Sequence, residues 1–191
     1  MGKAERVKVW RLPVRLFHWG LAALFLLAFV TEDGSINVHA AAGYAAAGLV
    51  FFRLAWGFVD DGFGSIKAFL HKPADVMAHL SAMLTATHNR YLGHNPAAAA
   101  MAVALMALIL ATAGSGVLAY GAEEMAGPLG FLFSRGRGWE DELEDIHGFF
   151  ANTTLAMAFI HLAGAALESV IHRENLVWSM ITGYKTGFQK E

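Results

Sequence analysis

The chain has 191 residues, of which 56% are hydrophobic and 16% are charged. Soluble domains carry charge on roughly a quarter of their residues, so this composition excludes an ordinary soluble protein and predicts an integral membrane protein. The sequence contains no cysteine, which excludes disulfides, cysteine-ligated iron–sulfur clusters and the covalent attachment of a c-type haem. The formal net charge of -2 indicates little about binding partners, and we expect no nucleic-acid partner.

Apolar residues concentrate in four stretches, which predict membrane spans at about 14–31, 39–59, 96–120 and 147–170. Each is close to the roughly 20 residues that a helix needs to cross a bilayer. The first stretch resembles a signal peptide, but no small-residue cleavage site follows it. We therefore predict an all-α integral membrane four-helix bundle that forms a single domain over residues 1–191.

The basic residues lie mainly before the first span, in the loop 60–95 and in the tail after His172, whereas Arg135 and Arg137 are the two between the third and fourth spans. The positive-inside rule therefore predicts cytoplasmic N- and C-termini.

The cytoplasmic loop is expected to contain a short helix over residues 74–87 that lies along the membrane surface. Its apolar side chains Val76, Leu80, Met83 and Leu84 fall on one helical face. Pro73 and Pro96 suit the first turns of this helix and of the third span. We favour a packing role without chemistry for the short helix.

The outer loop 121–146 is acidic. It carries seven acids, five of them between residues 140 and 145, against Arg135 and Arg137. The acidic run is either a docking patch or a set of carboxylates at a helix N-terminus, where the helix dipole favours negative charge. The sequence leaves both interpretations open.

Four of the nine histidines lie within the predicted spans: His18, His39, His147 and His161. An ionisable residue inside a membrane is by default a functional hypothesis. His147 and His161 are fourteen residues apart, which returns to within roughly 40° of one helix face and separates them by roughly 21 Å along the axis. His39 matches the depth of His147, and His18 matches that of His161.

Two opposed imidazoles without cysteine suit a six-coordinate haem iron. We predict two non-covalent b haems, the inner one bound by His18 and His161 and the outer one by His39 and His147. Zinc fits less well because a structural zinc site usually has four protein ligands. The alternative is that each histidine only bridges helices. The other histidines are not counted as ligands: His71, His79, His88, His94 and His172.

Two arginines are candidates for contacts to haem propionates. Arg53 lies deep in the second span and Arg15 is close to His18. A buried guanidinium needs an anionic partner, and the alternative is snorkelling to the interface. We find no carboxylate within the spans that suits proton conduction, assign no catalytic residue and leave the quinone site unassigned.

Four segments together carry a family resemblance: Leu12-Pro13-Val14-Arg15-Leu16-Phe17-His18-Trp19, Arg53-Leu54-Ala55-Trp56-Gly57-Phe58, Tyr91-Leu92-Gly93-His94-Asn95-Pro96, and Glu174-Asn175-Leu176-Val177 through Ile181-Thr182-Gly183. The chain resembles the prokaryotic cytochrome b561 family, which includes the cytochrome b subunit of nickel-iron hydrogenases. This resemblance implies a di-haem b fold whose ligands come from the first, second and fourth helices, which are His18, His39, His147 and His161 here.

The resemblance also implies electron exchange in the bacterial inner (plasma) membrane between the quinone pool and a redox partner. That partner is a c-type cytochrome or a hydrogenase in some branches and superoxide in another. The acidic outer loop would repel superoxide and attract a basic protein, so a separate redox protein is favoured over a superoxide:quinone oxidoreductase. A haem-free membrane anchor is the remaining alternative, and whether the chain is an enzyme stays open.

Overall fold

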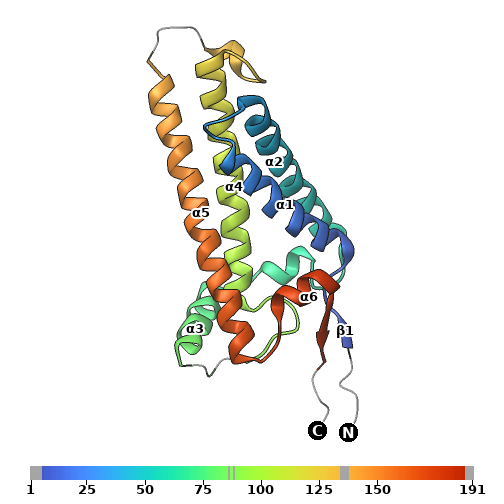
Figure 1. Ribbon diagram of the computed structural model, residues 1–191. Coiled ribbons are helices and arrows are strands. Elements are labelled where there is room, and N and C mark those ends of the chain that lie inside the picture. The colour runs from blue at the N-terminus through green and yellow to red at the C-terminus, as the bar shows by residue number, and fades with distance from the viewer. Residues whose placement is uncertain (1–5, 86, 88, 134–137, 188–191) are drawn as a thin grey trace. The chain divides into compact units, whose positions relative to one another are not determined.

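The computed structural model describes residues 6–85, 87, 89–133 and 138–187. Among them are four long apolar helices that could cross a membrane: α1 (Leu12–Val30), α2 (Ile36–Val59), α4 (Pro96–Glu124) and α5 (Glu140–Ile171). Two short α-helices, α3 (Pro73–Leu84) and α6 (Leu176–Thr182), and two 3-10 turns, η1 (Ile66–Phe69) and η2 (Gly130–Leu132), connect or follow them (Figure 1). The prediction of an all-α fold with four spans is confirmed.

The helix boundaries differ from the prediction most clearly at α5, which begins at Glu140 rather than at 147. Its first turn contains Glu140, Asp141 and Glu142, whose negative charges favour the exposed N–H groups of a helix N-terminus. The acidic run is therefore helical and does not belong to the loop. Likewise α2 begins at Ile36, which places His39 inside its first turn.

The chain divides into two compact units, each described by itself below. Unit 1 comprises residues 1–17, 53–104 and 159–191, and unit 2 comprises 18–52 and 105–158. Each long helix contributes one segment to each unit. The single-domain interpretation stays a prediction.

Unit 1 joins the two ends of the chain. Strand β1 (Arg6–Lys8) pairs antiparallel with β2 (Tyr184–Thr186), with Val7 opposite Lys185 (Figure 1). Close by, the carbonyl of Gly183 accepts hydrogen bonds from the backbone N–H groups of Val9 and Trp10, at 2.8 and 3.0 Å. Both ends of the chain therefore lie in one unit, as an even number of membrane crossings requires.

The helix α6 in unit 1 is capped at both ends. At its N-terminus the Asn175 side chain accepts a hydrogen bond from the backbone N–H of Trp178, at 2.8 Å. At its C-terminus Gly183 has a φ of 91°, and a Cβ there would lie 2.7 Å from the Trp10 carbonyl oxygen. Only glycine fits this left-handed position so close to another backbone segment.

Unit 2 contains segments of all four long helices. Small residues bring them together: a Cβ at Gly20 of α1 would lie 3.2 Å from Leu49 of α2, and the hydroxyls of Thr112 in α4 and Thr154 in α5 are 3.0 Å apart. Thr154 is 1% exposed. Contacts between small residues and between hydroxyl groups hold helices together in lipid. Burial of apolar side chains alone does not favour helix association there, because the lipid tails are equally apolar.

The predicted short helix in the cytoplasmic loop is present as α3, and Pro73 lies in its first turn as expected. Its predicted apolar face packs only in part, because Val76 and Met83 are half-buried while Leu80 is exposed. The Leu84 side chain lies outside the described part. The most deeply buried described side chain of α3 is His79, at 6% exposure.

Candidate haem site

Two of the predicted ligands, His39 and His147, face each other in unit 2. His39 extends from the first turn of α2 and His147 from the second turn of α5. Their ring centres are 5.8 Å apart and the ring planes are inclined at 87°. Two imidazoles bound to one metal through nitrogen at about 2 Å have ring centres roughly 6 Å apart. The separation of the ring centres therefore leaves room for a metal ion that the two imidazoles would hold.

In each ring, the hydrogen bond made by one nitrogen determines which nitrogen is available to bind a metal. Nδ1 of His39 lies 2.8 Å from the carbonyl oxygen of Ala28 in α1. Nδ1 of His147 lies 3.0 Å from the carbonyl oxygen of Thr112 in α4. Because a carbonyl oxygen can only accept, Nδ1 is the donor in both contacts, which leaves Nε2 as the nitrogen that would bind a metal. Metal-binding histidines are oriented in this way by a second hydrogen bond.

Helix α4 shapes the space around the ring of His147. A Cβ at Gly116 would lie 2.8 Å from Cε1 and 3.1 Å from Nδ1 of that ring, so only glycine admits it in its present position. The Ser115 hydroxyl lies 3.4 Å from the same Nδ1 and donates to the Thr112 carbonyl at 3.0 Å. By contrast, a Cβ at Gly43 or at Gly148 would meet nothing within 4 Å. The ring is tightly held on the α4 side, and open space remains beside both ligand helices.

The donor set suits a haem better than a bare ion. No group of three or more histidine, cysteine or acidic side chains among the described residues could hold a metal ion. Two protein ligands alone satisfy an iron whose four other positions come from a porphyrin.

The other predicted ligands lie in different units. His18 belongs to unit 2, where its ring meets the ring of Trp19 edge-on at 5.1 Å between centres. His161 belongs to the unit 1 part of α5 and is half-buried. Their pairing stays a prediction.

The two candidate arginines both have protein partners in unit 1. Arg53 is 4% exposed, donates to the Gly64 carbonyl at 2.8 Å and places its guanidinium 5.0 Å from the ring centre of Phe69. It is too buried to be snorkelling into water. Arg15 donates to the carbonyls of Met180 and Ile181 near the end of α6. Contacts of either arginine with a propionate stay a prediction.

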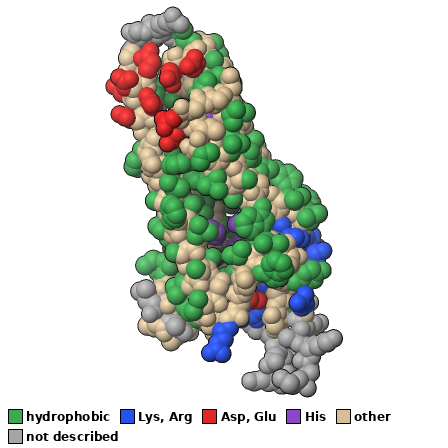
Figure 2. Space-filling view, in the orientation of Figure 1, with side chains coloured by type: hydrophobic (Ala, Val, Ile, Leu, Met, Phe, Trp, Pro, Cys, Tyr) green, Lys and Arg blue, Asp and Glu red, His purple; other side chains and the backbone are tan. Residues whose placement is uncertain are grey.

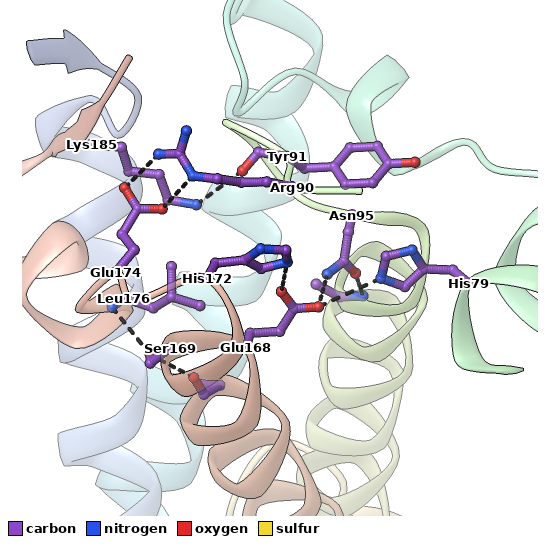
Figure 3. A network of polar contacts seen from close by, with 12 residues as sticks. His79, Arg90, Tyr91, Asn95, Glu168, Ser169, His172, Glu174, Leu176 and Lys185 are labelled. Atoms are coloured by element: carbon purple, nitrogen blue, oxygen red, sulfur yellow. Dashed lines mark hydrogen bonds and ion pairs between the residues drawn. The ribbon is translucent and has the colours of Figure 1, made fainter. Parts of the chain in front are cut away.

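A polar cluster in unit 1 surrounds Glu168, a carboxylate that the sequence analysis did not single out. Glu168 lies near the end of α5, with a side chain only 13% exposed. It accepts a hydrogen bond from Nδ2 of Asn95 at 2.8 Å, and its oxygens lie 3.5 Å from Nε2 of His79 and 3.3 Å from Nε2 of His172 (Figure 3). The available signal was spacing, because Glu168 follows His161 by seven residues and precedes His172 by four.

A second set of charges borders this cluster. Glu174 accepts from Nη2 and Nε of Arg90 at 2.8 and 3.3 Å (Figure 3). Lys185 of β2 lies close to both, with Nζ 3.4 Å from the Tyr91 carbonyl oxygen. Burial lowers the pKa of Lys185, and Arg90 acts in the same direction, while Glu174 and Glu168 oppose the shift. These contacts tie the loop before α4 to the C-terminal segment.

Acidic side chains gather at one end of unit 2. In Figure 2 they cluster near the first turns of α5 and the end of α4. Asp141, Glu142, Glu144 and Asp145 are all exposed, as are Glu123 and Glu124. Arg135 and Arg137 lie outside the described residues. The end of unit 2 is therefore a strongly negative surface.

The family model of prokaryotic cytochrome b561 matches residues 9–183. The chain belongs to this family. It is accordingly a multi-pass membrane protein that binds haem b and carries electrons, and the resemblance noted in the sequence is confirmed. Comparison with curated proteins and with solved structures gives no match.

Proposed function

We propose that the chain holds two b haems, the outer one between His39 and His147 and the inner one between His18 and His161. In this proposal it moves electrons between membrane quinone and a separate redox protein. The observation that carries the proposal is the facing pair in unit 2, with ring centres 5.8 Å apart and both Nδ1 atoms bonded to backbone carbonyls.

The residues around the outer site have distinct roles in this proposal. The Ala28 and Thr112 carbonyls orient the two rings and make their Nε2 atoms better ligands. Gly116 admits the ring of His147, and the open space beside Gly43 and Gly148 leaves room for a flat macrocycle. When bound, the haems supply one-electron redox couples, whose potentials depend on these hydrogen bonds and on burial.

The acidic end of unit 2 supports a basic protein as the partner. Its exposed carboxylates lie within the first two turns of α5, in the same turns as the haem ligand His147. A surface of one sign speeds the encounter with an oppositely charged protein. We therefore favour a c-type cytochrome or a hydrogenase subunit with a basic docking face. In this proposal, and in accord with the positive-inside rule, the acidic end lies outside the bacterial inner membrane and both termini lie in the cytoplasm.

A superoxide:quinone oxidoreductase is the second candidate and is ranked lower for an electrostatic reason. Superoxide is an anion, and a negative surface lowers its local concentration. A haem-free anchor is ranked last because the chain belongs to a haem b family.

The test uses the purified chain in liposomes with quinol in the membrane and a basic c-type cytochrome outside. The proposal predicts reduction of the chain by quinol, followed by reduction of the c-type cytochrome at a rate that falls steeply with added salt. Rapid quinone reduction by superoxide together with no transfer to the protein partner would favour the second candidate. A colourless protein would leave only the anchor.

A further inference from the structure

We propose that Glu168, His79 and His172 form a proton relay at the inner end of α5, which exchanges with the cytoplasm the protons that quinone chemistry takes up or releases. This proposal rests on the proposed function, because it assigns proton traffic to the quinone reaction. It gives a role to buried titratable side chains that the haem ligands do not explain.

The geometry brings two imidazoles to the two sides of one carboxylate. Nε2 of His79 from α3 lies 3.5 Å from Oε1 of Glu168, and Nε2 of His172 lies 3.3 Å from Oε2. The side chains of Glu168, His79 and His172 are 13%, 5% and 16% exposed. Figure 3 shows the two imidazoles beside the Glu168 carboxylate. Imidazole accepts and releases protons near neutral pH, and a carboxylate between two imidazoles can pass a proton to either.

Asn95 holds the carboxylate in place without titrating. Its Nδ2 donates to Oε1 of Glu168 at 2.8 Å, while its Oδ1 accepts from the backbone N–H of Ala98 at 2.7 Å in the first turn of α4. Asn95 itself is 8% exposed. Because it is anchored to α4, Asn95 fixes one oxygen of Glu168 and is a positioning residue in the relay.

An open recess gives the relay a route to water. The recess has a volume of about 390 Å³, and its lining includes His79, His71, Asp75 and Tyr91. The buried Nε2 of His71 has no hydrogen-bond partner among the described residues. His79 therefore borders the recess and also contacts Glu168. A proton can enter or leave through the recess by way of His79.

On the membrane side, the relay lies on the helix face that carries His161. Seven residues separate His161 from Glu168, which is two helical turns, within about 20° of the same face and roughly 10 Å along the axis. Both residues belong to unit 1. In the proposed function His161 is the inner haem ligand, so the same face of α5 presents the electron site and, two turns on, the proton site.

When a quinol becomes a quinone, two O–H bonds break, two electrons pass to the electron carrier and two protons pass to nearby bases. Glu168 accepts each proton at a carboxylate oxygen and passes it to Nε2 of His79 or His172. In the reverse direction the same groups deliver two protons to the two quinone oxygens.

Other charged groups lie near Glu168 besides the two histidines. Arg90 and Lys185 lie against Glu174, which accepts two hydrogen bonds from Arg90. Among the described residues, the titratable or charged groups near Glu168 include His79 of α3, His172 after α5, Lys185 of β2, and the pair Arg90 and Glu174. Lys185 interacts electrostatically with Glu168 as well as with Glu174.

The experiment compares wild type, Glu168→Gln, Glu168→Asp, His79→Gln and the control Glu174→Gln in liposomes. Glutamine at 168 keeps an oxygen for Asn95 but exchanges no proton. Each variant is measured for haem content, reduction by a small one-electron donor, quinol oxidation between pH 5 and 9, and the pH dependence of the haem midpoint potentials. The last of these reports proton coupling without turnover.

We expect Glu168→Gln to keep its haem and its reduction by the one-electron donor, while quinol oxidation falls roughly 100-fold. One haem potential should also become less dependent on pH. Glu168→Asp should recover part of the rate, His79→Gln should behave like Glu168→Gln, and Glu174→Gln should match wild type in all redox measurements.

The outcomes separate the two proposals. If wild type oxidises quinol and both Glu168→Gln and His79→Gln keep its rate and pH profile, the relay is overturned and the proposed function stands. If wild type binds haem but does not react with quinol, the proposed function fails and the relay fails with it. Use of His79→Gln beside Glu168→Gln keeps the test decisive if one variant does not fold.

Discussion

The ring of His39 meets the ring of His147 nearly at a right angle, with 5.8 Å between their centres, and each ring is oriented by a backbone carbonyl of a third or fourth helix. All four long helices therefore contribute to this one pair. Its geometry follows from helix packing, because displacement of α1 or α4 would remove one of the two carbonyls. The facing pair thus depends on segments of α1, α2, α4 and α5 in unit 2.

Removal of one ligand tests the independence of the two sites. His147→Leu should remove the outer haem and leave the inner one, and His161→Leu should do the reverse. Each variant should retain about half of the wild-type haem when the pyridine haemochrome is measured against protein. Equal loss from all four single-ligand variants would contradict two independent sites.

The contact between Gly116 and His147 predicts a steric effect with a close control. Gly116→Val should displace the ring, because even its Cβ would lie 2.8 Å from Cε1, and should reduce outer-haem binding at least tenfold. Gly114→Val, two residues away in α4, places its Cβ where nothing lies within 4 Å and should retain the haem. Haem titration of the purified variants measures the difference, and equal affinities would show that Gly116 does not shape the site.

The pair formed by Arg90 and Glu174 should contribute stability without taking part in electron transfer. Both side chains are largely buried, with exposures of 20% and 11%. Glu174→Gln keeps one acceptor oxygen for Arg90 but removes the negative charge and replaces the second oxygen with an amide NH2, which cannot accept. This change should cost about 2 kcal/mol, which corresponds to a fall in Tm of about 4 to 8 °C. Thermal unfolding followed by circular dichroism measures this change. An unchanged Tm would mean that the pair contributes no net stability.

The acidic end of unit 2 should control the rate of docking. The triple variant Asp141→Asn, Glu144→Gln, Asp145→Asn should lower the second-order rate with a basic c-type cytochrome about tenfold at low ionic strength. In high salt it should match wild type, because salt screens the same charges. Asp75→Asn, a change of an exposed carboxylate on α3, is the control and should have little effect. Stopped-flow mixing at several salt concentrations measures these rates.

The sequence predicted the four spans because spans depend on regular helix geometry, and it expected His39 and His147, whose ring centres lie 5.8 Å apart, at one depth. Their role as a ligand pair stays a prediction. Apolar length identifies a span, and residue depth follows from the rise per residue. It did not predict that Arg15 caps α6 or that Asn95 holds Glu168, because these contacts join segments 165 and 73 residues apart. Such contacts depend on which distant chain segments meet in unit 1, and helical periodicity in the sequence gives no information about that.

The family segments gain a physical explanation from these contacts. Asn95 caps α4 and binds Glu168, Asn175 and Gly183 cap α6, and Arg15 binds the last carbonyls of α6. Apart from His18, the residues that make the resemblance recognisable mainly build unit 1. The missed carboxylate, Glu168, lies in the same region, and its burial became visible only with its partners from α3 and α4 in place.

The most direct test of the proposed di-haem arrangement is the haem-to-protein ratio of the detergent-purified chain, expressed with adequate haem supply and measured with a reduced-minus-oxidised spectrum. Four histidines in two pairs predict two b haems per chain, both low-spin with bis-histidine spectra. One haem per chain would contradict one of the pairs, and a protein without haem would contradict both and return all four histidines to a role in helix packing.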